Sequence, residues 1–376
     1  MHRVLLSLIV LPVAACGPMD MRLDGGGGAG GGSTGCTVTL TGAYPDAGFA
    51  TNAAAEISLL GKLNALNAPM RAAELDAGFT VTRMQLDELF SAGTPSLSSL
   101  TAAGFQPVVQ ETFTAFLASQ GRVWTPMDPP MSGGIYGSGT SQWIYSERGV
   151  DLRQVIDKGL YGALFYGEAV KRMPTATTPE SIDQLLALYG ATPNFPQNDT
   201  TAPGRDELMA KYAKRRTPQG MTGQYTTMRD AFVRARLAAG SASCTAERTA
   251  ALETIKSEWE EMLAATVVFY VNSAATKLQD PMADVAKKSS AMHDLGEGAS
   301  FFLGLKAVPQ ANRRITDAQI DQVLTAMKIP SLAGSTAFQL LTTVPPDIDA
   351  LLAANMQLQT VYGFTADEMV RFRTNF

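Results

Sequence analysis

The chain has 376 residues, of which 45 % are hydrophobic and 17 % charged, and its formal net charge is −5 at pH 7. This length and apolar content are enough for one large domain or two modest ones with a buried core. A mildly acidic protein lacks the positive charge that nucleic-acid binding needs, so that class of partner is excluded. The one basic cluster, residues 211–216, falls at the end of a predicted helix, where cations suit the helix dipole. We interpret it as a solvated helix end and not as a binding patch.

The first sixteen residues have the layout of a bacterial lipoprotein signal. A positive charge at Arg3 precedes an apolar run over residues 4–13, and small residues lead into Cys16. We therefore expect residues 1–15 to be a cleaved signal peptide and Cys16 to carry a lipid. Loss of Arg3 would move the net charge from −5 to −6. The alternative is a plain secreted protein in which Cys16 has no role.

A glycine-rich segment separates this signal from the rest of the chain. Residues 25–35 are almost entirely glycine, and such a sequence cannot bury apolar surface and behaves as a flexible coil. We expect residues 16–35 to tether the lipid to a folded domain of residues 36–376. Because Gly17 and not Asp follows Cys16, the outer membrane is favoured. The expected location is the bacterial cell envelope, facing the periplasm or the exterior, with the lipid as the only membrane contact and no transmembrane helix.

Two cysteines remain once Cys16 is assigned to the lipid. In an oxidising compartment, Cys36 and Cys244 favour a disulfide. It would close a loop of about 200 residues and stabilise the fold by ~4 kcal/mol through chain entropy. Two unpaired thiols are the alternative.

Apolar residues recur at helical spacing through most of the chain, and strand patterns are nearly absent. Two helix starts carry clear capping signals, Asp280 followed by Pro281, and Thr316 with Gln319 three residues later. The spacing predicts helices over residues 52–66, 83–90, 105–119, 150–172, 178–189, 206–215, 226–239, 245–277, 281–305, 317–324, 347–360 and 365–373.

Residues 124–149 differ from this pattern because proline and glycine interrupt them. Apolar residues at 135–136 and 143–145 flank Gly-Ser-Gly at 137–139, which predicts a small hairpin at most. No strand-to-helix unit with further glycines follows, so this is not a nucleotide-binding loop.

The predicted fold class is therefore all-α, a multi-helix bundle with a small Gly/Pro-rich loop or hairpin insertion. Two arrangements stay open: a single helical domain over residues 36–376, or two packed bundles over residues 36–149 and 150–376.

Two predicted helices carry small residues at a spacing of four, which places them on one face. Glycine inside a helix costs ~1 kcal/mol relative to alanine, so these positions need a reason. Close approach of the two helices is the simplest reason, and we expect them to pack together. The two stripes are Gly159, Ala163 and Gly167 in one helix, and Gly296, Ser300 and Gly304 in the other.

His293 is the only histidine outside residues 1–15, and it lies four residues before Glu297 on the same helix face. Imidazole and carboxylate supply two metal ligands, whereas an iron or zinc site needs three or four. The candidates for further ligands are Glu168 and the carboxylates Glu258, Glu260 and Glu261. Two interpretations stay open: a structural hydrogen-bonded pair that bridges to a neighbouring helix, or a ligand or metal site. The segment around Glu258 (EWEE, residues 258–261) is interpreted as a solvated edge with Trp259 in the core.

No catalytic residue is assigned from the sequence. Gly-x-Ser-x-Gly occurs only at residues 31–35, inside the glycine-rich segment and not at a strand-to-helix elbow, and the chain has no His-Glu-x-x-His pattern.

Several segments resemble an uncharacterised family of bacterial envelope lipoproteins, classed as a domain of unknown function. They cover most of residues 43–376, and the resemblance implies a helical domain outside the cytoplasm without an assigned activity. The segments are residues 154–166 (QVIDKGLYGALFY), 228–232 (MRDAF), Trp259 with 264–272 (AATVVFYVN), and His293 with 296–298 (GEG) and 301–305 (FFLGL).

The chain is also similar, more loosely, to imelysin-like helical envelope proteins, which are associated with iron uptake. Their motif has Gly two residues before the histidine and Glu three residues after it. Here Ala291 replaces the Gly, and Glu297 is four residues after His293. The similarity implies a metal role for this pair, with peptidase activity as a further implication.

The sequence thus predicts a lipid-anchored binding or interaction domain, with a ligand between the helices that carry Glu168 and His293. The alternatives are a metal-binding, imelysin-like protein with iron or zinc at that place, and an envelope scaffold in which His293 only stabilises the fold.

Overall fold

The computed structural model describes residues 36–40, 42–196, 204–218 and 223–376. Cys36–Phe376 forms one compact unit, and Met1–Gly35 is a second unit outside the described residues. The predicted signal peptide, the lipidation at Cys16 and the glycine-rich tether all fall in that second part. In the described residues, no helix combines the length and the apolar character that crossing a membrane would need.

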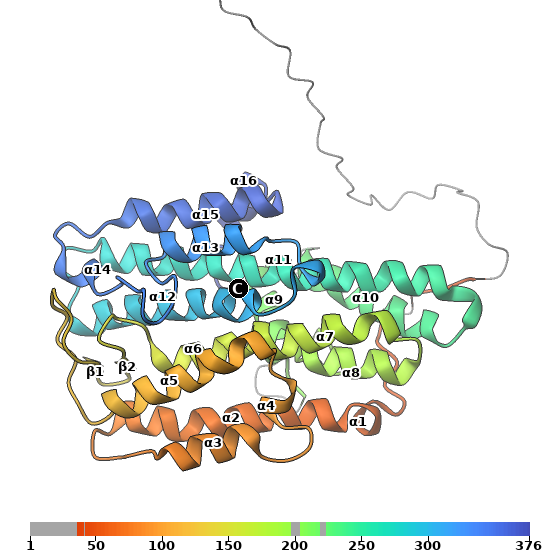
Figure 1. Ribbon diagram of the computed structural model, residues 1–376. Coiled ribbons are helices and arrows are strands. Elements are labelled where there is room, and N and C mark those ends of the chain that lie inside the picture. The colour runs from red at the N-terminus through yellow and green to blue at the C-terminus, as the bar shows by residue number, and fades with distance from the viewer. Residues whose placement is uncertain (1–35, 41, 197–203, 219–222) are drawn as a thin grey trace, which may run out of the picture. The chain divides into compact units, whose positions relative to one another are not determined.

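The fold of Cys36–Phe376 is all-α with one small hairpin, which confirms the predicted fold class (Figure 1). The helices are α1 Phe49–Asn52, α2 Ala54–Leu75, α3 Arg83–Ser91, α4 Leu97–Leu100, α5 Gln106–Ser119, α6 Leu152–Leu160, α7 Gly167–Arg172, α8 Pro179–Tyr189, α9 Leu208–Arg216, α10 Gln224–Ala239, α11 Thr245–Leu278, α12 Val285–Lys306, α13 Asp317–Ala326, α14 Gln339–Thr342, α15 Ile348–Tyr362 and α16 Ala366–Arg371.

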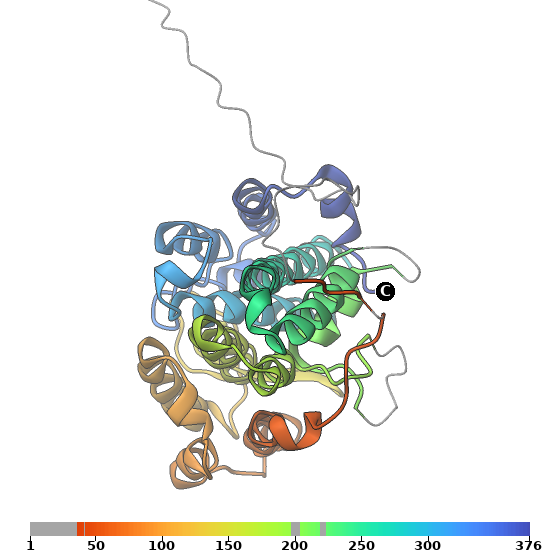
Figure 2. The same cartoon turned by 90° about the vertical axis from the view of Figure 1, so that its right-hand side faces the viewer.

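Helices α11 and α12 form the centre of this unit and pack along each other. Figure 1 shows α13 and α15 on one side of the pair and α6 on the other, and the end-on view of Figure 2 shows the surrounding helices. The central side chains are large and fully buried, among them Trp259 on α11 and Phe301 and Phe302 on α12. Burial of each such side chain stabilises the fold by about 1.5–3 kcal/mol, so this pair anchors the core.

The two capping signals have different outcomes. The Thr316–Gln319 capping box opens α13 as predicted. The predicted start at Asp280 is wrong, because α12 begins at Val285 with Asp284 as its N-cap. Asp280 instead closes a turn before the helix, where its side chain accepts from the backbone N–H of Met282 at 2.9 Å. The side chain of either aspartate can cap a helix. The turn that follows Asp280 prevents a helix from starting there, so the helix starts after Asp284.

The helix predicted over residues 150–172 is interrupted by a wider π-helical turn, Tyr161–Tyr166, between α6 and α7. This turn packs on α12, where a Cβ added to Gly162 would lie 2.5 Å from the backbone N of Leu305. Gly159 lies one turn before Gly162, and its carbonyl O would lie 1.9 Å from a Cβ added to Gly304 on α12. The two helices therefore approach each other so closely here that only glycine fits.

The predicted hairpin is confirmed. β1 (Gly134–Ser138) pairs antiparallel with β2 (Ser141–Tyr145). Its two strands dock on α12 through Ser289, whose Oγ donates to the carbonyl O of Tyr136 at 2.7 Å and whose carbonyl O accepts from the Tyr145 hydroxyl at 2.7 Å. This docking fixes the position of Trp143, in the middle of β2.

The predicted disulfide between Cys36 and Cys244 is confirmed. Cys244 lies just before α11, so the bond ties the first described residue to the turn between α10 and α11.

Two sequence interpretations of charged residues are wrong. Arg216 is not solvated: it is buried, its guanidinium stacks 4.1 Å from the Phe269 ring, and it donates to the carbonyl O of Phe372 at 2.8 Å. Glu260 is not at a solvated edge either, although its neighbour Trp259 is in the core as predicted.

Glu260 instead joins three parts of the chain. Its carboxylate accepts from the backbone N–H groups of Arg314 (2.8 Å) and Ile315 (2.9 Å) and from the Tyr362 hydroxyl (2.9 Å). These hydrogen bonds satisfy a buried carboxylate and explain why it lies inside the fold.

Candidate functional site

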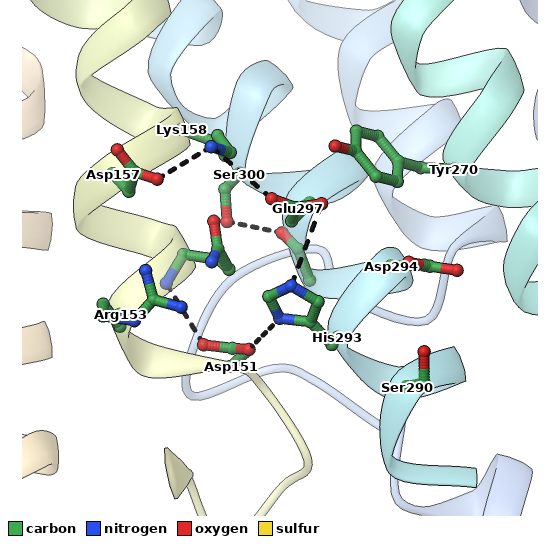
Figure 3. Close-up of polar contacts among 12 residues, drawn as sticks. Asp151, Arg153, Asp157, Lys158, Tyr270, Ser290, His293, Asp294, Glu297 and Ser300 are labelled. Atoms are coloured by element: carbon green, nitrogen blue, oxygen red, sulfur yellow. Dashed lines mark hydrogen bonds and ion pairs between the residues drawn. The ribbon is translucent and has the colours of Figure 1, made fainter. Parts of the chain in front are cut away.

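A chain of ionisable side chains lies between α6 and α12 (Figure 3). His293 and Glu297 come from α12, and Asp151 and Lys158 come from the start and the end of α6. These residues are largely buried: the side chain of Asp151 is 0 % exposed, and those of Lys158, Glu297 and His293 are 9, 12 and 16 % exposed. Small exposures of this kind leave one edge of the cluster in reach of solvent.

Asp151 has two tasks at the start of α6. Its Oδ1 caps the helix by accepting from the backbone N–H of Gln154 at 3.2 Å, and its Oδ2 lies 2.7 Å from Nδ1 of His293. An ionised carboxylate only accepts, so Nδ1 carries a proton and donates it to Asp151. The helix cap therefore also sets which imidazole nitrogen faces the rest of the cluster.

Gly296 makes this contact possible. A Cβ at Gly296 would lie 2.8 Å from the Cβ of Asp151, so a larger residue would push the carboxylate away from α12. Its carbonyl O accepts from the hydroxyl of Ser300 at 2.6 Å, one turn further along. The small-residue stripe of α12 thus serves the cluster as well as the helix contact.

Trp143 holds the imidazole from one face. Its ring and that of His293 are stacked, with centroids 4.1 Å apart and planes at 9°. The guanidinium of Arg71 lies 5.7 Å from the centroid of the Trp143 ring. Together with the Asp151 hydrogen bond, this stacking leaves the imidazole little freedom to rotate.

The second imidazole nitrogen is oriented toward Glu297. Nε2 lies 3.9 Å from Oε2 of Glu297, which is longer than a hydrogen bond. A polar contact at such a distance is commonly bridged by a water or a ligand atom. Figure 3 shows both groups on the same side of α12.

Lys158 supplies the positive charge opposite Glu297. Its Nζ lies 2.7 Å from Oδ2 of Asp157 and 3.5 Å from Oε1 of Glu297. Burial opposes its charged form, but the charge of Asp157 and of other nearby groups outweighs burial and raises the pKa of Lys158 well above its ordinary value. Lys158 therefore stays an ammonium and Glu297 has a fixed cationic neighbour.

The imidazole of His293 titrates in this charged surrounding. Burial disfavours its protonated form, but the charge of Glu297 and the hydrogen bond and charge of Asp151 outweigh burial, so the pKa of His293 is raised above 6.5. A raised pKa means that His293 stabilises the fold fully below its unfolded pKa, and that this contribution is lost as the pH rises through the folded pKa.

We expect Glu297→Gln to lower the pKa of His293, because it removes the negative charge that most favours the protonated imidazole. The measurement is an NMR titration of the His293 ring resonances in the wild type and the variant. Lys288→Gln, at an exposed position of the same helix, is the control and should leave the pKa in place. A pKa of His293 that is the same with and without Glu297 would contradict this account.

The structure brings only some of the predicted site residues together. Glu297 is beside His293, but Glu168 pairs with Arg172 at 2.8 Å and Lys171 at 3.1 Å on its own helix. Glu258 belongs neither to the His293 cluster nor to the ion pairs of Glu168. Burial, followed by the charges of Glu261 and Glu368, raises the pKa of Glu258 to about 8. Among the described residues, no group of three or more His, Cys, Asp or Glu is arranged to hold a metal ion.

Three residues of the cluster were not predicted from the sequence: Asp151, Trp143 and Lys158. Asp151 had a detectable signal, because aspartate is a typical N-cap and this one lies at the second position of the helix predicted over residues 150–172. Lys158 follows Asp157 directly and precedes an uncharged run over residues 159–166, and a charged pair at the edge of such a run marks a position with special partners. Nothing in the sequence connects Trp143 to His293, since the contact depends on how the hairpin docks.

Comparison with known families adds one match. Residues 188–331 match a family described as a domain of unknown function (DUF4856). The matched segment includes His293 and Glu297 but ends short of α15, and it begins after Asp151 and Lys158. No curated protein and no solved structure matches the chain. The match agrees with the resemblance to a domain of unknown function and assigns no activity.

Proposed function

We propose that this chain is a lipid-anchored, helical binding protein of the bacterial cell envelope. The signal-like residues 1–15, Cys16 and the glycine-rich tether support an anchored location. The Cys36–Cys244 disulfide supports an oxidising compartment, because such bonds persist outside the cytoplasm.

The ligand site of this proposal is the cluster between α6 and α12. The observation that carries it is the fixed imidazole of His293, held at Nδ1 by Asp151 and stacked on Trp143, with Nε2 left 3.9 Å from Glu297. Rigidly held polar groups lose little entropy when they bind, so they favour recognition of a small polar group. A ligand hydroxyl or amide that bridges Nε2 and the Glu297 carboxylate fits this geometry.

A thermal-shift screen tests the proposal on the full chain. The probes are amino acids, dipeptides and monosaccharides, and a binder should raise the unfolding temperature of the wild type in proportion to the logarithm of its concentration. His293→Gln should abolish that shift, whereas Lys288→Gln, exposed on the same helix, should keep it. If no probe shifts the wild type, or if His293→Gln responds like the wild type, the cluster is structural.

A metal role is the second candidate, and the Asp151–His293 contact favours it. Histidine ligands commonly donate their other ring N–H to a carboxylate, as His293 does here. With Glu297 the cluster offers two protein ligands for iron or zinc, and a water and a substrate group would have to complete the site. The neighbouring Lys158 ammonium opposes a cation at this place. Peptidase activity of an imelysin-like kind would depend on such a metal.

Elemental analysis separates the two candidates. The full chain is purified without chelator or histidine tag and compared with His293→Ala, before and after incubation with iron and zinc. Near-stoichiometric metal that disappears in the variant would support the metal role. Absence of metal from both proteins after incubation would overturn it and leave the small-ligand proposal standing.

A further inference from the structure

The basic cluster of residues 211–216 borders a cavity that is separate from the His293 cluster. The cavity has a volume of about 370 Å³. This lies at the lower end of the range for small-ligand sites, roughly 300–1,000 Å³. Four basic residues line it, Arg205 before α9 and Lys211, Lys214 and Arg215 on α9.

The acidic side chains at the cavity are already engaged. Glu207 pairs with Arg205 at 2.5 Å, and Asp206 accepts a hydrogen bond from the Tyr225 hydroxyl. Within the described part of the chain, Lys211 and Arg215 have no ion-pair partner within 4.0 Å. The cavity therefore carries excess positive charge in a protein whose net charge is −5.

The neighbouring cations also affect the titration of Lys211. Desolvation is the largest cause that lowers the pKa of Lys211, and the charge of Arg215 is the second. Glu207 raises this pKa, and Lys158 and Arg205 lower it by smaller amounts. Cations that disfavour each other in this way attract an anion, because an anion would relieve their repulsion.

One wall of the cavity is held in place by Arg216. On the inner side of α9, Arg216 donates to the carbonyl O atoms of Phe372 (2.8 Å) and Thr374 (3.1 Å). The backbone N–H of Phe376 donates to the carbonyl O of Arg215 at 3.1 Å. These contacts keep Phe376 beside the basic face of α9, where it lines the cavity with the cations.

We propose that this cavity is a binding site for the phosphate group of a small phosphate monoester. Arg215 offers paired N–H donors that match phosphate oxygens, and Lys211 adds a compact positive charge. Phe376 supplies apolar surface for the uncharged part of the ligand. The phosphate belongs to a soluble monoester or to the headgroup of a phospholipid, and both sources use the same contacts.

Isothermal titration calorimetry on the full chain tests this site with glucose 6-phosphate, glucose and sulfate. Vesicles of phosphatidylcholine with and without phosphatidic acid test the lipid source. We expect saturable binding of glucose 6-phosphate or of the phosphatidic acid vesicles, and none of glucose or of phosphatidylcholine alone. Binding of the sugar phosphate assigns a soluble source, and binding of the vesicles alone assigns a headgroup.

Charge-reversal variants connect the binding to these residues. Lys211→Glu with Arg215→Glu should weaken binding at least about tenfold, which corresponds to about 1.4 kcal/mol. The matched control is Arg122→Glu with Lys288→Glu, at two exposed positions away from the cavity. It changes the net charge equally and should bind like the wild type. If the first variant fails to fold, Lys211→Gln with Arg215→Gln replaces it.

Three results would overturn the proposal. They are the absence of saturable binding to every phosphate probe, equal weakening in the two charge-reversal variants, and binding of sulfate as tight as that of glucose 6-phosphate. Equal weakening would mean attraction to the overall charge, and tight sulfate binding would mean a general anion site.

Discussion

Replacing both Cys36 and Cys244 by serine is expected to lower the free energy of unfolding by about 4–5 kcal/mol. The bond spans a sequence separation of 208 residues, and a cross-link over so long a loop removes much of the conformational entropy of the unfolded chain. Chemical denaturation monitored by circular dichroism measures the change.

Reduction provides the control for this prediction. Wild-type protein with reductant should unfold at the same denaturant concentration as the double serine variant, and the reductant should leave the variant unchanged. Equal unfolding midpoints for oxidised and reduced wild type would show that the disulfide does not stabilise the fold.

Gly304→Ala is expected to destabilise the protein by about 3 kcal/mol, at the upper end of the usual cost of overpacking. The added Cβ would lie 1.9 Å from the carbonyl O of Gly159 and 2.7 Å from its carbonyl C, so the backbone of α6 or α12 has to move. This cost exceeds the gain of ~1 kcal/mol that alanine normally brings to a helix interior.

Gly61→Ala is the matched control for this substitution. Gly61 also lies inside a helix, α2, but no heavy atom lies within 4 Å of the position of an added Cβ. Only the helix propensity acts there, so this variant should be more stable than wild type by up to ~1 kcal/mol. Thermal unfolding measures the stability of both variants. If Gly304→Ala is as stable as Gly61→Ala, the close helix contact is disproved.

The helices themselves were predictable, because apolar periodicity and capping residues are local properties of the sequence. The Thr316–Gln319 capping box and the hairpin that contains Gly-Ser-Gly lie where the sequence placed them. Asp280 shows the limit of local signals: two aspartates four residues apart both resemble caps, and the turn after Asp280 decides between them.

The candidate site was predictable only in part. His293 and Glu297 were found because their spacing places them on one helix face, and the spacing of Gly296, Ser300 and Gly304 marked the same helix as closely packed. Glu168 fitted a partner role equally well by sequence, but it pairs with Arg172 in its own helix. Local spacing cannot tell which helix a polar face meets.

The sequence by itself determined the helical class, the segment that forms the hairpin, and the two cysteines available for a disulfide. It did so because helical periodicity, turn chemistry and cysteine count need no knowledge of distant residues. The tertiary structure alone decided that Asp151 and Trp143 fix His293, that Arg216 is buried, and that Lys211 and Arg215 face a cavity. Each of these depends on contacts between segments far apart in the chain, where packing selects the partner of every buried polar group.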